Sequence, residues 1–469
     1  MMFLKSKSRC PPVVVAGLTL NGATVLRRMA HLGYEAHGLS FSPKEPGWHV
    51  GGAHHHRVPD PREDFEGWVD TLVRLADDFD VPPPILPMSD VYVVAFDRAA
   101  PRLEGHYRLH GFGTGLRTLL TSKRGTFDRA AEVDFPRPVS RWVESRDELA
   151  AFAEELSTPV LVKPNFAFEW KSPAAARIIG KRKVATGPNI DELLRAYDEV
   201  ASVTPGVLAQ EVIPGPDENL VYWCGFVGPE GRVGGRLVGR KRRIVPIHYG
   251  SATFVELVDA PEVEDQCERF LTALGYQGLC GIELKQDPRD GVAKLIEVNP
   301  RYSLWDDIGV PVGVDLAHEA VDSLLRGPRT EPRRPRHFRQ KWVELCRDVP
   351  AAFEYHKEGQ LSLWEWMRSL SPPIVVNDLP VLHDPGYAYH MISRRLRKLA
   401  GLVDGRDAVD VRAPAEPSGS PAGSDAVAPG PPASPADTRT TEHQGLEEVL
   451  TLQPGHASDL LETRSPSGA

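Results

Sequence analysis

A short run near residue 300, LIEVNPRYS from Leu295 to Ser303, combines residue types that bind metal ions and phosphates. Its apolar residues, interrupted by Glu297, predict a buried strand that carries one carboxylate. Asn299 follows two positions later, so its side chain lies on the same face of the strand. Pro300 ends the strand because it has no N–H for the ladder, and Arg301 comes next. One strand end therefore presents a carboxylate, an amide oxygen and a guanidinium.

A second carboxylate precedes this run, because GIELKQD places Glu283 inside another apolar stretch. Two carboxylates and an amide oxygen are hard ligands that suit Mg²⁺, which takes substrate phosphates as further ligands. Arg301 can bind a phosphate or a carboxylate with two parallel hydrogen bonds. The alternative is a sheet with two salt-bridged glutamates. Buried carboxylates are rare without partners, which favours the metal site.

Basic side chains recur upstream of both carboxylates. Lys163 ends the apolar strand VLVKP, Lys123 lies at a helix start, and GRKRR (residues 239–243) alternates between two faces of an extended segment. QEVIPGPDEN is a strand exit whose backbone can bind a base edge, with Glu218 placed to take ribose hydroxyls. Each lysine alone is best interpreted as a surface charge. Together with the carboxylates they outline a nucleoside triphosphate pocket.

The elements that must position these side chains begin with strand, helix and strand over residues 12–40, the start of a βαβ unit. A helix over 65–79 and a strand over 85–88 extend this pattern. The turn GLTLNG is not the GxGxxG fingerprint, so a dinucleotide site is disfavoured. His54, His55 and His56 suggest a metal site, but a surface loop before VPDP is the preferred interpretation.

From residue 119 onwards strands come in runs between helices, which predicts an α+β fold. A polar loop of small residues is expected after VLVKP, and GPEG predicts a hairpin between two long strands. After a Pro/Arg linker, residues 337–401 are expected to be mostly helical, with Trp342, Trp364 and Trp366 in the core. From about residue 404 the Pro, Ala, Ser and Gly content predicts disorder.

Composition limits the class of protein. The chain has 469 residues, 41% of them hydrophobic, which allows two or three domains. Its five cysteines are scattered without a CxxC pair, which argues against disulfides and a zinc site and for the cytoplasm. The start has no signal-peptide stretch, and VVVAGLTL is too short to span a membrane. Most of the net charge of −9 belongs to residues 404–469, and no basic face suggests nucleic acid.

The order of these motifs resembles the ATP-grasp superfamily, and is most similar to the carboxylate–amine ligase group that includes D-aspartate ligases. The resemblance runs from about Pro12 to Lys398 and rests on TSK, VLVKP, QEVIPG with Glu218, GRK, GIELK and IEVNPR in that order. It implies an α/β, Rossmann-like pre-ATP-grasp domain over 1–118 and an α+β ATP-grasp domain over 119–330. A helical extension over 331–403 and a disordered, acidic tail over 404–469 complete the expected organisation.

The resemblance also implies a role for each motif residue. Lys123 and Lys163 match the lysines that bind the α- and β-phosphates. The hinge that contacts adenine is matched by Gln210, Glu211, Val212 and Ile213. Glu218 matches the residue that binds the ribose. Lys241 matches the residue near the γ-phosphate, with Arg240 or Arg242 as alternatives. Glu283 and Glu297 match the Mg²⁺ carboxylates, Asn299 a further ligand, and Arg301 the residue that stabilises the acyl phosphate. The loop 166–180 lacks the usual glycine-rich run, so Lys171, Lys181 and Lys183 are all candidates for phosphate contact.

The activity implied is that of an ADP-forming ligase, with a small-molecule carboxylate and an amine as substrates and ATP with Mg²⁺, or Mn²⁺, as cofactors. No nucleic acid or membrane partner is expected, and a homodimer is one option for the assembly. Three alternatives stay open: carboxylase-like ligation, a non-catalytic ATP-binding protein and a dinucleotide oxidoreductase. The identity of both substrates does not follow from the sequence.

Overall fold

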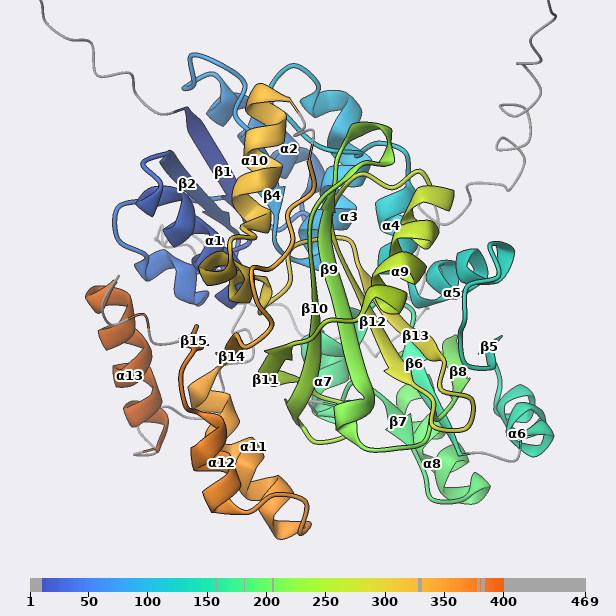
Figure 1. The fold of residues 1–469 in the computed structure, drawn as a ribbon. Coiled ribbons are helices and arrows are strands. Elements are labelled where there is room, and N and C mark those ends of the chain that lie inside the picture. The colour runs from blue at the N-terminus through green and yellow to red at the C-terminus, as the bar shows by residue number, and fades with distance from the viewer. Residues whose placement is uncertain are drawn as a thin grey trace, which may run out of the picture. The chain divides into compact units, whose positions relative to one another are not determined.

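The computed structural model describes residues 11–156, 159–180, 182–204, 206–327, 331–377, 380 and 384–399. The expected tail at 404–469 and the candidate Lys181 lie outside these residues. The described chain contains three β-sheets with helices packed around them (Figure 1).

The first sheet has four parallel strands in the order β3-β2-β1-β4. Its elements are β1 (Pro12–Ala16), α1 (Leu20–His31), β2 (Glu35–Ser40), the 3-10 helix η1 (Pro46–His49), β3 (His54–Arg57), α2 (Phe65–Ala76), β4 (Ile85–Pro87) and α3 (Asp90–Leu103). Strand β1 is apolar along its length because helices cover both faces of a parallel sheet. Gly17 turns the chain from β1 towards α1 with φ +97°, a conformation that favours glycine. The predicted βαβ start is confirmed.

The prediction of a surface loop at His54, His55 and His56 is wrong, because these residues form the edge strand β3. The strand pairs in parallel with β2, with His54 opposite His37 and His56 opposite Leu39. A run of three histidines has no apolar alternation, so its sequence gave no strand signal. The backbone pairing with β2, rather than the side chains of the three histidines, makes this segment a strand.

The second sheet is antiparallel, in the order β5-β8-β6-β7, and helices cover it. The elements of this region are α4 (Leu116–Thr121), α5 (Lys123–Glu132), β5 (Ser140–Val143), α6 (Arg146–Glu155), β6 (Val160–Pro164), η2 (Glu169–Lys171), α7 (Pro173–Ile179), β7 (Ala185–Thr186), α8 (Ile190–Ala201) and β8 (Val207–Glu211). The segment after β6, predicted as a loop, contains the helix α7. Ser172 caps this helix by accepting from the Ala175 N–H, and Pro173 begins it.

The third sheet has seven strands in the order β13-β12-β9-β10-β11-β14-β15. The strands of this sheet up to residue 326, with the helices before, between and after them, are η3 (Asp217–Asn219), β9 (Leu220–Val227), η4 (Pro229–Gly231), β10 (Val233–Val245), β11 (Ser251–Leu257), α9 (Pro261–Ala273), β12 (Gly278–Gln286), β13 (Ala293–Asn299), η5 (Asp306–Val312) and α10 (Leu316–Arg326). The predicted hairpin at GPEG joins β9 to β10, and the two strands predicted to carry Glu283 and Glu297 pair with each other.

The C-terminal part is less helical than predicted. It contains β14 (Lys341–Val343), α11 (Leu345–Lys357), α12 (Leu363–Ser369), β15 (Ile374–Val376) and α13 (Pro385–Leu399), and both strands extend the seven-stranded sheet. Trp342 is fully buried on β14, as predicted for the core, whereas Trp364 is 70% exposed on α12. The difference arises because a strand beside β11 buries its central side chain, while α12 turns Trp364 to the surface.

One buried carboxylate connects this C-terminal part to the sheet. Asp348 on α11 is fully buried and accepts two hydrogen bonds from Arg243, both 2.8 Å, and one each from Thr253 and Trp366, both 2.9 Å. We expect Asp348→Ala to lower the free energy of unfolding by about 3–5 kcal/mol, because Arg243 is left buried without its counter-ion. Urea unfolding measures this loss. Glu354→Ala, at an exposed position of the same helix, is the control, and an equal change in both variants would contradict the prediction.

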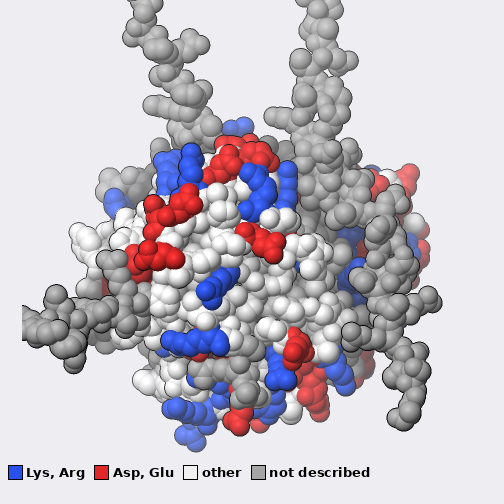
Figure 2. All heavy atoms as spheres, turned by 90° about the horizontal axis from the view of Figure 1, so that it is seen from above, with Lys and Arg blue, Asp and Glu red and all other residues white. Residues whose placement is uncertain are grey.

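The surface of the described part mixes charges. On the face in Figure 2, Lys and Arg side chains lie among Asp and Glu side chains. In the part of the chain that the structure describes, every helix is too short or too polar to cross a bilayer.

Candidate active site

A cleft of about 1050 Å³ lies between the second and third sheets and extends to the turn before α1. Of the predicted site residues, Glu218 does not line it, and the ones that do are Lys123, Lys163, Gln210, Glu211, Val212, Ile213, Lys241, Glu283, Glu297, Asn299 and Arg301. Lys171 and Lys183, the described candidates of the loop after β6, line it as well. The fold thus brings together predicted site residues that lie up to 178 positions apart in the sequence, from Lys123 to Arg301.

The two carboxylates form one cluster. Glu283 on β12 is the register partner of Glu297 on β13, so their side chains share one face of the sheet. Lys241 Nζ lies 2.5 Å from Glu283 Oε2, and Lys123 Nζ lies 2.8 Å from Glu297 Oε2. Asn299 Nδ2 donates to Glu297 Oε1 over 2.9 Å. Each carboxylate therefore has a lysine partner from another element of the fold.

Glu297 is ionised in this setting. Burial alone raises the pKa of its carboxyl group, but the charge and hydrogen bond of Lys123, the charge of Lys183 and the hydrogen bond from Asn299 outweigh burial and hold the pKa well below its usual range. A carboxylate that stays charged at neutral pH can bind a metal ion without first losing a proton. The cluster combines hard oxygen donors with nearby cations, which is the composition of a Mg²⁺–phosphate site.

Local structure fixes the lysines. The Ser122 hydroxyl accepts from the Gly125 N–H and so caps α5, which makes Lys123 the first residue of the helix. Lys163 at the end of β6 donates to Gln210 Oε1 on the neighbouring strand β8 over 2.8 Å. Lys183 donates to Ser251 Oγ over 2.6 Å. Lys123 lies on α5, Lys163 on β6 and Lys183 in the loop before β7, and all three residues line the cleft.

Burial gives two of these lysines unusual acidity. It lowers the pKa of Lys163 to about 8, with a further contribution from Lys123, and it lowers the pKa of Lys183 to about 8 as well. Polyphosphate binding favours the charged form of a neighbouring amine and raises its pKa. We therefore expect ATP binding at pH 8 to take up protons, up to roughly one per nucleotide, and the uptake to vanish near pH 6.5, where both amines are already charged.

Calorimetric titration of ATP at pH 8 in two buffers of different ionisation enthalpy measures this uptake. The variant Lys163→Met should lose about half of it. Uptake that is equal at pH 6.5 and pH 8 would contradict the assignment of these lysines to the phosphates.

Arg301 is held from two sides. Its Nε donates to Asp90 Oδ1 over 2.6 Å, and its Nη2 donates to Asn299 Oδ1 over 3.0 Å. Burial raises the pKa of Asp90, but Arg301 outweighs this and the pKa is lowered overall. Asp90 was not predicted as a site residue. It follows β4 at the carboxyl end of a parallel sheet, where polar residues gather at ligand sites, and that position was the available signal.

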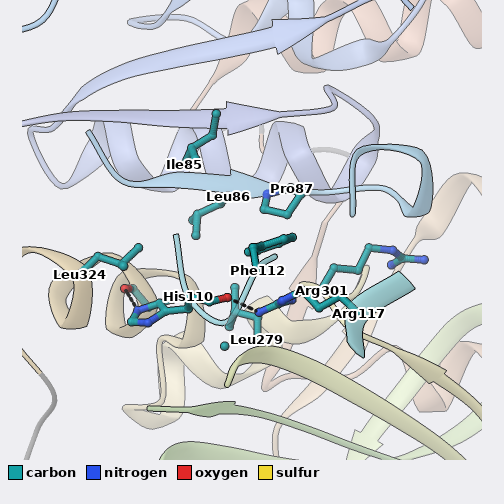
Figure 3. A pocket seen from close by; sticks show the side chains of 11 residues that line it. Ile85, Leu86, Pro87, His110, Phe112, Arg117, Leu279, Arg301 and Leu324 are labelled. Atoms are coloured by element: carbon teal, nitrogen blue, oxygen red, sulfur yellow. Dashed lines mark hydrogen bonds between the residues drawn. The ribbon is translucent and has the colours of Figure 1, made fainter. Parts of the chain in front are cut away.

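A second residue that the sequence did not indicate, Arg117, supports the backbone directly after β13. Arg117 is buried and donates to the carbonyl oxygens of Pro300 (2.6 Å), Gln277 (2.6 Å) and His110 (2.9 Å). Figure 3 shows this guanidinium on the His110 carbonyl, beside Phe112 and close to Arg301. Pro300 lies between Asn299 and Arg301, so Arg117 fixes the backbone that aims both side chains.

Comparison with known proteins agrees with this geometry. No protein-family model matches the chain. D-aspartate ligase from Enterococcus faecium is 24% identical over 215 residues, which are 44% of this chain and 50% of that protein. The C-terminal section of the carbamoyl phosphate synthase large chain from Methanopyrus kandleri is 27% identical over 206 residues, or 41% and 35% of the two chains. The chain therefore spans half or less of the length of these curated relatives.

Solved structures match over more of the chain. The ADP complex of N5-carboxyaminoimidazole ribonucleotide synthetase has a TM-score of 0.54 at 13% identity and covers 71% of this chain and 80% of its own. The structure of L-amino acid ligase from Bacillus licheniformis matches with a TM-score of 0.52 at 18% identity, over 68% of this chain and 75% of its own. The chain has an ATP-grasp fold. The predicted resemblance to this superfamily is confirmed.

In the ATP-grasp cleft, two backbone amides of the predicted adenine hinge already donate to other parts of the protein. The N–H of Glu211 donates to Val139 O over 2.9 Å, and that of Val212 donates to Pro159 O over 2.7 Å. Ile213 follows them and lines the cleft. The Glu211 carboxylate pairs with Arg289 at 2.7 Å. The hinge role of Glu211 and Val212 stays a prediction, and their amides are already engaged within the protein.

The predicted ribose ligand lies away from the ATP-grasp cleft. Glu218 has a side chain that is 56% exposed and pairs with Arg242 at 2.8 Å. Its role stays a prediction that requires the side chain to leave Arg242. Among the basic residues of β10, Lys241 faces the cleft, whereas Arg242 pairs with Glu256 and Glu218. A register irregularity around these residues separates their directions.

Proposed function

We propose that this chain is an ADP-forming ligase that activates a small carboxylate as an acyl phosphate with ATP and joins it to an amine. The observation that carries the proposal is the Glu283–Glu297–Asn299 cluster, which lies within contact distance of Lys123, Lys241 and Arg301 in one cleft. The similarity to D-aspartate ligase and the fold shared with L-amino acid ligase support the same chemistry. A non-catalytic ATP-binding protein would not need this acidic cluster intact.

The residues fit a divalent metal ion. Glu283, Glu297 and Asn299 offer charged and neutral oxygen donors, the set that Mg²⁺ prefers and that Mn²⁺ also accepts. When bound, the ion would neutralise charge on the β- and γ-phosphates. The charge and hydrogen bond of Lys123 help to keep Glu297 ionised, and the amines of Lys123 and Lys241 are both placed to move to the phosphates. The biotin carboxylase domain from Hydrogenobacter thermophilus, which shares the fold at TM-score 0.53, was solved with MgADP.

Each side chain then has one task. Lys123 and Lys163 bind the α- and β-phosphates, Lys241 positions the γ-phosphate, and Arg301 stabilises the acyl phosphate as it forms. A carboxylate oxygen of the substrate attacks the γ-phosphorus, which forms a P–O bond and breaks the bond to the β-phosphate, so that ADP leaves. The amine nitrogen next attacks the acyl carbon, phosphate departs with the carbon–oxygen electron pair, and the amine proton passes to solvent. Preorganised cations stabilise the negative charge in both steps.

The proposal extends to the organisation of the chain. We assign residues 1–118 to a Rossmann-like pre-ATP-grasp domain, 119–330 to the ATP-grasp domain and 331–403 to an extension, although β14 and β15 of that extension complete the third sheet. Cys224, Cys267 and Cys280 are buried free thiols, which supports a reducing cytoplasm. The substrates are small molecules, and a homodimer stays an option.

A screen tests the proposal. Release of ADP and phosphate is measured from ATP and Mg²⁺ with pooled amino acids, other small carboxylates and amines. The expected result is release that depends on one carboxylate and one amine together. Release with bicarbonate alone would instead favour carboxylase-like ligation. ATP binding without release under any pool would favour the non-catalytic alternative.

A further inference from the structure

A cluster of imidazoles lies on the N-terminal sheet, outside the cleft. Glu35 and His37 occupy alternate positions of β2, and His54 and His56 occupy alternate positions of β3, so each pair projects from one face of its strand. The register places His37 directly beside His54. The rings of His37 and His54 stack with centroids 4.7 Å apart, and those of His37 and His56 with centroids 5.2 Å apart. Two parallel strands thus present four ligand-type side chains at one place.

The potential ligand atoms converge. His37 Nε2 lies 3.4 Å and His54 Nε2 lies 3.9 Å from the same oxygen, Glu35 Oε1. One atom from each of the three side chains falls within 4.8 Å of the others. A single ion with bonds of about 2 Å can reach three donors at these separations after small side-chain rotations.

One of these atoms has no hydrogen-bond partner among the described residues. The side chain of His37 is 8% exposed, and its Nε2 is buried without a hydrogen bond, although it points towards the Glu35 carboxylate. Its other nitrogen, Nδ1, is engaged with His56 Nε2 at 2.9 Å. If Nδ1 carries the proton and donates to His56, the Nε2 lone pair faces a carboxylate oxygen at 3.4 Å, and a cation between the two atoms would stabilise this arrangement.

The neutral form of an imidazole is the form that binds a metal ion, and burial favours that form for His37. Burial, followed by the charges of His56 and His54, lowers the pKa of His37 to about 4. Burial also lowers the pKa of His56. Metal-binding imidazoles commonly donate their second N–H to a neighbouring acceptor, which fixes the ring, and His56 occupies that position relative to His37.

We propose that Glu35, His37 and His54 bind a divalent transition-metal ion of the Zn²⁺ class, with His56 as the residue that orients His37. Two imidazole nitrogens and one carboxylate favour Zn²⁺ and related ions over Mg²⁺, which prefers oxygen ligands. The side chains of Glu35 and His54 are 38% and 63% exposed, so the ion would enter from solvent and keep open positions. It would fasten the edge strand β3 to β2. This site is separate from the oxygen-rich cluster at Glu283 and Glu297 and does not rest on the proposed ligase activity.

Equilibrium dialysis of the full chain against Zn²⁺, with Mg²⁺ in excess, tests the proposal. We expect one bound Zn²⁺ per chain that Glu297→Gln does not remove. His54→Ala and Glu35→Gln should each weaken binding by at least roughly 100-fold, and His56→Ala by roughly 10–100-fold. His54 and Glu35 are both exposed enough that their variants will fold. His37→Ala removes a buried ring, so its Zn²⁺ binding is interpreted only if circular dichroism shows that the variant is folded.

The matched control is His55→Ala, because His55 lies on the same strand but projects to the opposite face, where it contacts Gly47 O at 3.0 Å. This variant should keep its Zn²⁺. The visible absorption of bound Co²⁺ gives a second readout that should vanish in His54→Ala and persist in His55→Ala. Zinc binding that survives His54→Ala, or that disappears in Glu297→Gln, would overturn the proposal. A proton found by NMR on His37 Nε2 that Zn²⁺ does not displace would overturn it as well.

Discussion

Replacing Glu297 with glutamine is expected to lower ligase turnover by roughly 10²–10³-fold or more while the protein stays folded. Glutamine has the shape of glutamate but lacks the charge that the pairing with Lys123 and the proposed metal ion require. Glu297 also accepts from Asn299, so the substitution disturbs the whole acidic cluster. ADP release with the substrate pair found by the screen, at saturating ATP and Mg²⁺, measures the loss.

Two controls accompany this variant. Glu262→Gln alters an exposed glutamate in the first turn of α9 and should leave turnover unchanged. Circular dichroism and thermal unfolding establish that Glu297→Gln is folded. Turnover within a few-fold of the parent in the folded variant would remove Glu297 from the catalytic cluster, and with it the metal assignment.

The second large effect is expected at Arg301. The substitution Arg301→Lys keeps the positive charge but loses the planar group that contacts Asp90 and Asn299 together. We expect kcat to fall about 10²-fold, because a donor aimed at the developing charge is lost. The KM for ATP should change little, since the α- and β-phosphates are assigned to other residues. Steady-state kinetics with varied ATP separates the two parameters.

Neighbouring substitutions sharpen this result. Asp90→Asn leaves the guanidinium in place but weakens its anchor, so its effect on kcat should be smaller than that of Arg301→Lys. Arg102→Lys, on the exposed part of the same helix α3, should have none. A KM for ATP that rises while kcat is unchanged in Arg301→Lys would assign Arg301 to ground-state nucleotide binding instead.

The motifs with strong local signals were predictable from the sequence. IEVNPR and GIELK each combine an apolar strand with one carboxylate, and their pairing follows from a short connection between antiparallel strands. Lys123 was predictable as a helix start because Ser122 is a good cap. These are properties of a few consecutive residues, which is why pattern and spacing sufficed.

Contacts between distant segments were not predictable. Arg117 reaches Pro300 across 183 positions of sequence, and Arg301 reaches Asp90 across 211. Neither Arg117 nor Asp90 stands in a motif, and their roles arise only when α4 and the start of α3 pack against the end of β13. The edge strand β3 was missed for a related reason: its pairing with β2, rather than its own three histidines, makes it a strand.

The most direct test of the proposed chemistry follows an oxygen atom. Once the substrates are identified, the carboxylate is labelled with ¹⁸O, and the phosphate released in the complete reaction is analysed by mass spectrometry. An acyl phosphate requires that one carboxylate oxygen leave with the phosphate, so each turnover should yield one phosphate with one ¹⁸O. Phosphate without label would mean that the carboxylate never attacked the γ-phosphate, and would contradict the account.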